Sequence, residues 1–156
     1  MILAAISLLT SGSFAGCGGS EDNPPAADAG PAIGAECTVG GASNDDVIAI
    51  QSPALECGSG PCLQIPLAAD VALPPGSRLT DLCTADCSSD EDCTPVPDSP
   101  CQTGFTCGVV TAVGPFCCRK LCMCRDYIVV PEGGLPEPAA CDASNPDNRC
   151  VNLPGR

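Results

Sequence analysis

Cysteine is the residue type in this chain whose number and spacing carry the most chemistry. The sequence has 15 cysteines among 156 residues and no histidine. The absence of histidine excludes mixed Cys/His zinc sites, and such a cysteine density is typical of disulfide scaffolds in secreted chains. Trp is absent and aromatic residues make up 3% of the chain, so apolar burial alone is a weak source of stability. We therefore expect an oxidising compartment and a fold held by disulfides.

Cys17 stands apart from the other cysteines. It follows the apolar run ILAAISLL at 2–9, which is too short to span a bilayer but has the length of a signal-peptide core. The motif Phe14-Ala15-Gly16-Cys17 resembles the signal of bacterial lipoproteins. In that family the cysteine is alkylated with diacylglycerol, the peptide is cut just before it, and the new amine is acylated. The resemblance implies a lipid anchor on Cys17, with Phe14, Ala15 and Gly16 recognised by the signal peptidase.

Three further features bear on the lipid interpretation. Subtracting Cys17 from 15 cysteines leaves 14, an even number that allows seven bridges; the alternative is that Cys17 pairs and another thiol stays unpaired. In Gram-negative lipoproteins an Asp directly after the lipidated cysteine marks retention in the inner membrane. The residue at that position here is Gly18, so the resemblance implies that the protein is located in the outer membrane. No basic residue precedes Arg78, and we expect the true start to lie upstream of Met1, where a basic region would belong.

The composition changes along the chain and predicts four segments. Residues 1–16 are a signal peptide, and 17–36 are the lipidated cysteine with a flexible acidic Pro/Gly tether. Residues 37–150 form the disulfide-stapled module, and 151–156 are a C-terminal tail. The net charge of −13 argues against a nucleic-acid partner. We expect a monomer attached to a membrane through lipid, whose protein or glycan partner the sequence does not specify.

The cysteines of the module are predicted to pair with one another, in an order that the sequence leaves open. The loop from Cys57 to Cys62 is short and rich in Gly and Pro, and could close on itself. Adjacent Cys117 and Cys118 are expected to reach different partners, because a bridge requires Cα atoms about 4.4–6.8 Å apart. The predicted disulfide pool is Cys37, Cys57, Cys62, Cys83, Cys87, Cys93, Cys101, Cys107, Cys117, Cys118, Cys122, Cys124, Cys141 and Cys150.

Short apolar pieces bounded by Gly, Pro, Asp or Cys predict short β-strands. These pieces lie at 47–50, 63–67, 109–113 and 127–130. No segment has a sustained helical repeat, and 17 Pro and 17 Gly punctuate the chain. The predicted fold class is small and disulfide-rich, with many loops, short β-strands and little or no helix apart from the signal peptide. The C-terminal stretch is expected to be irregular and tied down by Cys141 and Cys150.

Two cysteine blocks resemble known proteins. The segments CSSDEDC at 87–93 and CCRKLC at 117–122 resemble pieces of the four-disulfide-core domain of the whey acidic protein type. Many members of that family inhibit serine proteases, so the resemblance implies an inhibitor as the alternative function, although here residues 94–116 separate the two pieces. The other interpretation of the first block is a turn in which Asp90 accepts backbone N–H bonds between bridged strands.

The whole arrangement resembles uncharacterised cysteine-rich surface lipoproteins of myxobacteria and related Gram-negative lineages. The resemblance is carried by the lipid-attachment motif, the acidic tether, the CSSDEDC block and the segment GPFCCRKLCMC. It implies a location on the cell envelope and no activity.

The remaining motifs give little support to catalysis or metal binding. Without histidine there is no His-based triad, and the sequence lacks C-x-x-C, G-x-S-x-G and phosphate-loop motifs. We therefore predict a non-enzyme without cofactor or metal, whose exposed body has a binding or structural role. Two alternatives stay open: a thiolate metal cluster at Cys117, Cys118, Cys122 and Cys124, and calcium binding by Asp86, Asp90, Glu91 and Asp92 or by Asp142, Asn145 and Asp147.

Overall fold

The computed structural model describes residues 32–41, 46–145 and 150. The expected lipid-attachment motif at 14–17 and the expected tail at 151–156 lie outside these residues. Within the described part, every helix is a single 3₁₀ turn and every strand is five residues or shorter. Seven disulfides connect these elements. The predicted small, disulfide-rich and loop-rich fold is confirmed.

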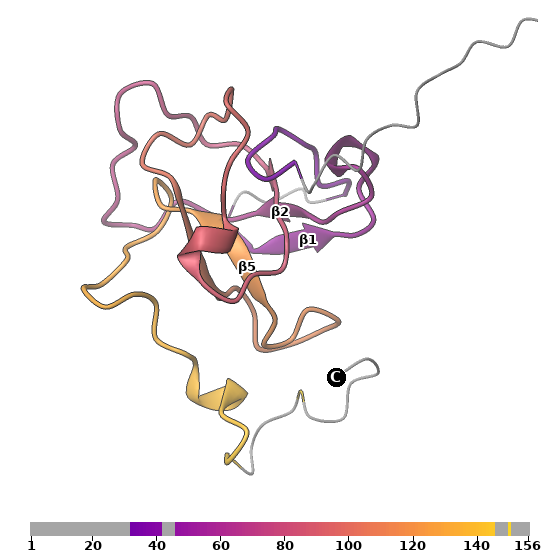
Figure 1. The fold of residues 1–156 in the computed structure, drawn as a ribbon, viewed down its shortest axis with the longest axis vertical. Helices are drawn as coiled ribbons and strands as arrows, with labels where there is room; N and C mark the ends of the chain where they lie inside the picture. The colour runs from indigo at the N-terminus through magenta and orange to yellow at the C-terminus, as the bar shows by residue number, and fades with distance from the viewer. Residues whose placement is uncertain (1–31, 42–45, 146–149, 151–156) are drawn as a thin grey trace, which may run out of the picture.

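The first sheet is antiparallel and has three short strands, two of which are labelled in Figure 1. It consists of β1 (Ala49–Gln51), β2 (Cys62–Gln64) and β3 (Leu82–Cys83), in that spatial order. Leu63 is central because it lies opposite Ile50 on one side and Leu82 on the other. The sheet therefore presents a row of apolar side chains toward the interior.

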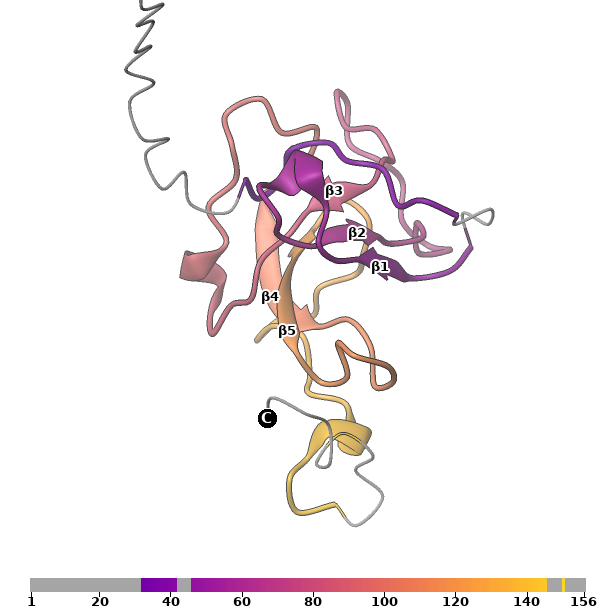
Figure 2. The same ribbon diagram turned by 90° about the vertical axis from the view of Figure 1, so that its right-hand side faces the viewer.

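The second sheet is a hairpin of β4 (Phe105–Val109) and β5 (Lys120–Cys124) (Figure 2). Four consecutive residues of β5 are buried, from Leu121 to Cys124, because one face of the hairpin packs on the core and disulfides cover part of the other. Three single-turn 3₁₀ helices lie in the connections: η1 (Leu55–Cys57), η2 (Asp90–Asp92) and η3 (Ala139–Cys141).

The predicted strands match the structure in part. The pieces at 47–50 and 63–67 overlap β1 and β2, whereas only the first residue of 109–113 lies in a strand and 127–130 contains none. In the segment at 127–130, the Tyr127 carbonyl accepts a hydrogen bond from the Ala68 N–H at 3.0 Å. This contact is not part of a series of strand-to-strand hydrogen bonds. Sequence patterns missed β3 and β5, because β5 alternates cysteine with apolar residues and both strands depend on distant partners.

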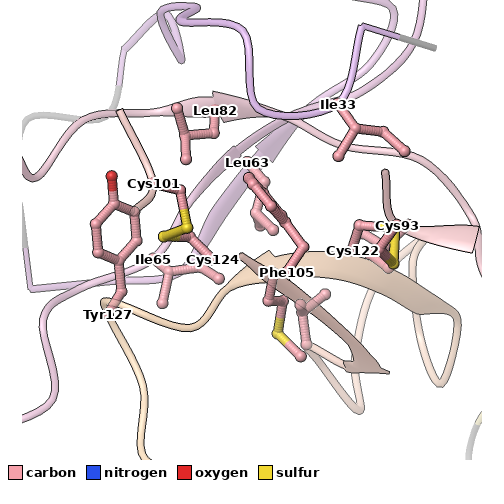
Figure 3. Packing of buried hydrophobic residues seen from close by; sticks show 13 residues of the cluster. Ile33, Leu63, Ile65, Leu82, Cys93, Cys101, Phe105, Cys122, Cys124 and Tyr127 are labelled. Atoms are coloured by element: carbon pink, nitrogen blue, oxygen red, sulfur yellow. A yellow bond between two sulfur atoms is a disulfide. The ribbon is translucent and has the colours of Figure 1, made fainter. Parts of the chain in front are cut away.

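The main core lies between the two sheets (Figure 3). Phe105, Leu63 and Leu82 pack there beside two disulfides, Cys93–Cys122 and Cys101–Cys124. Sulfur atoms thus occupy interior volume that aromatic rings fill in other small domains. Tyr127 closes one end of the core, with its hydroxyl donating to the Arg78 carbonyl at 2.7 Å. Burial raises the pKa of Tyr127 to about 12.

The module begins before Cys37, so the predicted tether boundary at residue 36 is wrong. Ile33 is buried in the main core, and its carbonyl accepts a hydrogen bond from the Val96 N–H at 2.8 Å. Gly34 has a φ of +80°, and a Cβ there would lie 2.9 Å from the Phe105 ring, so only glycine fits. The segment was predicted as a flexible tether from its acidic Pro/Gly composition, but at Gly34 the glycine is required for close packing.

Candidate functional site

The sulfur atoms are the first candidate for function, and the structure pairs every cysteine from Cys37 to Cys150. Cα separations across the bridges are between 5.3 and 6.0 Å, within the usual range. The pairs are Cys37–Cys62, Cys57–Cys83, Cys87–Cys107, Cys93–Cys122, Cys101–Cys124, Cys117–Cys150 and Cys118–Cys141. No described cysteine is left over to pair with Cys17, which itself lies outside the described residues.

Two of the expectations about pairing are confirmed and one is wrong. Adjacent Cys117 and Cys118 reach different partners, and the C-terminal stretch is tied down through Cys141 and Cys150. The predicted closure of the loop by a bridge between Cys57 and Cys62 is wrong, because each of these cysteines pairs with a different partner. Cys57 ends η1 whereas the next cysteine begins β2, so the two side chains face different neighbours.

The sulfur-rich clusters lack the chemistry of a thiolate metal site. The sulfurs of Cys117, Cys118 and Cys150 lie close together, with 3.0 Å between the Sγ atoms of Cys118 and Cys150. Each of these sulfurs already belongs to a disulfide, and a thiophilic metal requires thiolates. The proposed four-cysteine set is also divided, because Cys122 and Cys124 bridge to the main core instead.

Asp90 in the CSSDEDC block joins η2 to the second sheet. Its Oδ1 atom accepts the Cys107 N–H at 2.7 Å and the Thr106 hydroxyl at 3.0 Å, and its Oδ2 pairs with the Arg125 guanidinium. The backbone hydrogen bond from Cys107 is the largest cause that holds the pKa of Asp90 below its ordinary value. Because Cys107 is bridged to Cys87, the predicted turn in which Asp90 accepts an N–H between bridged segments is confirmed.

The other acidic residues considered for calcium are also engaged by protein donors. Asp92 accepts the backbone N–H groups of Ser88 and Ser89, at 2.7 and 3.0 Å, and these bonds lower its pKa. Asp86 pairs with the Arg119 guanidinium. Asp142 accepts from Ser144, and Asn145 donates to the Ala139 carbonyl at 2.7 Å; Asp147 lies outside the described residues. These contacts give the acidic residues structural roles.

Asp126 is a buried carboxylate that the sequence analysis missed. It is 2% exposed and accepts the backbone N–H groups of Gln102 and Thr103, at 2.6 and 2.9 Å, as well as the Thr103 hydroxyl. Burial acts to raise the pKa of Asp126, but the hydrogen bonds to its charged form outweigh burial and hold the pKa below its ordinary value. Asp126 thereby fixes the turn beside the Cys101–Cys124 bridge.

Replacing Asp126 with Asn is expected to lower the free energy of unfolding of the oxidised protein by about 1.5–3 kcal/mol at pH near 7, because hydrogen bonds to a charged group are lost. A depressed folded-state pKa contributes stability above the unfolded value of about 3.9 and loses it as the pH falls further. The Asp126→Asn deficit should therefore shrink in acid. Urea unfolding at neutral and acidic pH measures it, with Asp98→Asn at an exposed position as control; an equal deficit at both pH values contradicts the assignment.

A shallow groove with apolar side chains lies on the surface of the described part of the chain. It has a volume of about 220 Å³ and lies between β1 and the loop that joins β4 to β5. Ile48 and Val113 are 47% and 68% exposed at its rim. The residues that line it are Ile48, Ile50, Thr111, Val113, Pro115 and Phe116. An exposed apolar depression of this kind is typical of an interaction surface.

The comparisons with known proteins found no match for this chain. No family model matches the chain, and neither the curated proteins nor the solved structures contain a match. Among the described residues there is no helix of the length and apolar character needed to cross a membrane.

Proposed function

We propose that this chain is a lipid-anchored protein of the bacterial cell envelope, whose disulfide-stapled body has a non-catalytic binding or structural role. One observation carries the proposal: the cysteines from Cys37 to Cys150 pair among themselves, in seven bridges. This pairing accounts for 14 of the 15 cysteines in the sequence. The remaining thiol belongs to Cys17, in the motif where a lipoprotein signal requires an unpaired cysteine.

The lipid supplies membrane attachment that needs no spanning helix. A single acyl chain binds a bilayer only marginally, whereas two or more chains anchor stably, at about 0.8 kcal/mol per buried CH₂ group. A diacylglyceryl group on the Cys17 sulfur and an acyl group on its amine together meet that requirement. Gly18 at the next position favours the outer membrane as the destination.

The chemistry of the described side chains supports a non-catalytic role. The chain has no histidine to act as a base near neutral pH. Backbone N–H groups hold the pKa values of Asp90 and Asp92 below the ordinary range. Burial acts to raise the pKa of Asp126, but side-chain and backbone hydrogen bonds together hold it below the ordinary range. Carboxylates held in the charged form by backbone donors are positioned to fix turns, and they are poorly suited to proton transfer at neutral pH.

Metabolic labelling with an alkyne fatty acid tests the proposal. The wild-type protein is expected to incorporate the label, and Cys17→Ser is expected to incorporate none, because serine cannot form the thioether to the diacylglyceryl group. The double variant Cys118→Ser/Cys141→Ser, which removes one bridge and leaves Cys17 in place, is the matched control and should be labelled like the wild type. Label on Cys17→Ser would contradict the proposal.

A further inference from the structure

The outer edge of β1 has backbone groups directed away from its own sheet. The Thr84 N–H donates to the Pro61 carbonyl at 2.9 Å, and hydrogen-bonded and non-hydrogen-bonded pairs alternate along an antiparallel ladder. Leu63 therefore directs its N–H and C=O groups toward β3. The residues before and after Leu63 direct their N–H and C=O groups toward β1 and form hydrogen bonds with it. It follows from the register that Ile50, opposite Leu63, directs its N–H and C=O groups outward.

Ile48 lies two residues before Ile50, just outside β1, which begins at Ala49. Both side chains line the apolar groove. β1 is the end strand of its sheet, with no described strand beside its outer edge, and Figure 2 shows that it is the strand of that sheet nearest the β4–β5 loop. Ile50 thus offers outward backbone groups, and Ile48 and Ile50 together offer an apolar contact surface.

The opposite wall of the groove is held rigidly in place. The Thr111 hydroxyl accepts the Val113 N–H at 3.2 Å, and the Thr111 carbonyl accepts the Cys118 N–H at 2.8 Å. The Arg119 guanidinium lies 4.7 Å from the centre of the Phe116 ring. Two disulfides leave from the adjacent cysteines that follow Phe116. A wall fixed in this way loses little conformational entropy when a ligand binds.

We propose that the groove is a docking site for an extended peptide segment of another protein, which adds to the outer edge of β1 as a further strand. Its backbone would pair with Ile50, and its apolar side chains would contact Ile48, Val113 and Phe116. Strand addition requires both features, an open edge and a row of apolar contacts beside it. This inference goes beyond the lipid anchor and does not depend on it.

Charge selects the class of peptide. The chain has a net charge of −13, and Asp46 is exposed beside β1. The arginines Arg78, Arg119 and Arg125 are already paired with carboxylates. A second copy carries the same negative charge and is repelled, whereas a segment that alternates apolar and basic residues is attracted. The occupant is therefore a basic, alternating strand from a different protein.

The test uses the oxidised full chain with Cys17→Ser, so that no lipid competes for the apolar groove. The probe is the fluorescein-labelled peptide KVKVKVK, whose binding is measured by fluorescence anisotropy. We expect saturable binding, at least about tenfold weaker binding of EVEVEVE, and a similar loss when the KVKVKVK amides that face β1 are N-methylated. Equal binding of the methylated peptide would overturn the proposal, because charge alone would then explain the affinity.

Paired variants locate the site. Val113→Asn should weaken KVKVKVK binding about tenfold by removing apolar contact without adding charge, whereas Val129→Asn, at a residue that is 61% exposed and lies outside the groove, should leave it unchanged. Disulfide mass and circular dichroism check that both variants fold. Equal affinities of the two variants would overturn the proposal. So would sedimentation showing a dimer that Val113→Asn dissociates, because a second copy would then be the occupant.

Discussion

Cys17→Ser is expected to move the protein completely from the membrane fraction to the soluble fraction. The acyl chains on Cys17 are the proposed membrane contact, and each buried CH₂ group contributes about 0.8 kcal/mol to attachment. Loss of every chain therefore removes far more binding free energy than an acidic surface can replace. Carbonate washing of isolated membranes followed by immunoblotting of both fractions measures the distribution.

Two controls make the Cys17 result specific. Cys118→Ser/Cys141→Ser should stay with the membrane, because it retains Cys17 and loses one bridge elsewhere. The soluble Cys17→Ser protein should still resist alkylation without reduction, which shows that it reached the oxidising compartment and folded there. A Cys17→Ser protein that has lost its signal peptide and still remains on carbonate-washed membranes would refute the anchor.

Removal of the central bridge by Cys93→Ala/Cys122→Ala should lower the free energy of unfolding by about 2–5 kcal/mol. Both cysteines are buried in the main core between the sheets, so their loss also leaves space that the few large side chains cannot fill. Removal of the Cys118–Cys141 bridge should change core stability by about 1 kcal/mol or less. That bridge belongs to a separate cluster with Cys117 and Cys150, which we expect to open as a local unit.

Tyrosine fluorescence during urea unfolding reports this difference. Tyr127 is the single tyrosine and the sequence has no tryptophan, so the signal comes from a residue that is 2% exposed at the end of the main core. The Cys93→Ala/Cys122→Ala transition should move to much lower urea concentration than that of Cys118→Ala/Cys141→Ala. Equal shifts would show that the two clusters unfold as one unit.

The fold class could be predicted from composition, whereas the pairing could not. Cysteine density, scarce aromatic residues and frequent Gly and Pro identify a stapled fold with short strands. The partner of any one cysteine depends on three-dimensional register, as Cys57 and Cys62 show: they are near in sequence and bridge to different neighbours. Local patterns likewise missed β5, whose burial comes from bridges on both sides of Met123.

The candidate sites likewise include features that could be predicted from the sequence and features that could not. The role of Asp90 was predictable in kind from the CSSDEDC block, although its backbone donor, Cys107, lies 17 residues away in sequence. No sequence pattern pointed to Asp126, whose backbone donors lie 24 and 23 residues away. The apolar groove joins Ile48 to Val113 across two sheets, and each residue alone is an ordinary exposed aliphatic side chain.

The division of the cysteines into one that carries lipid and fourteen that pair is tested most directly by intact mass spectrometry of protein extracted from membranes. Alkylation before reduction should add no label, and alkylation after reduction should add 14, one for each cysteine of the seven bridges. The mass of the N-terminal fragment should correspond to an acylated chain that begins at Cys17. Fifteen labels after reduction, or an N-terminal fragment without lipid, would contradict the account.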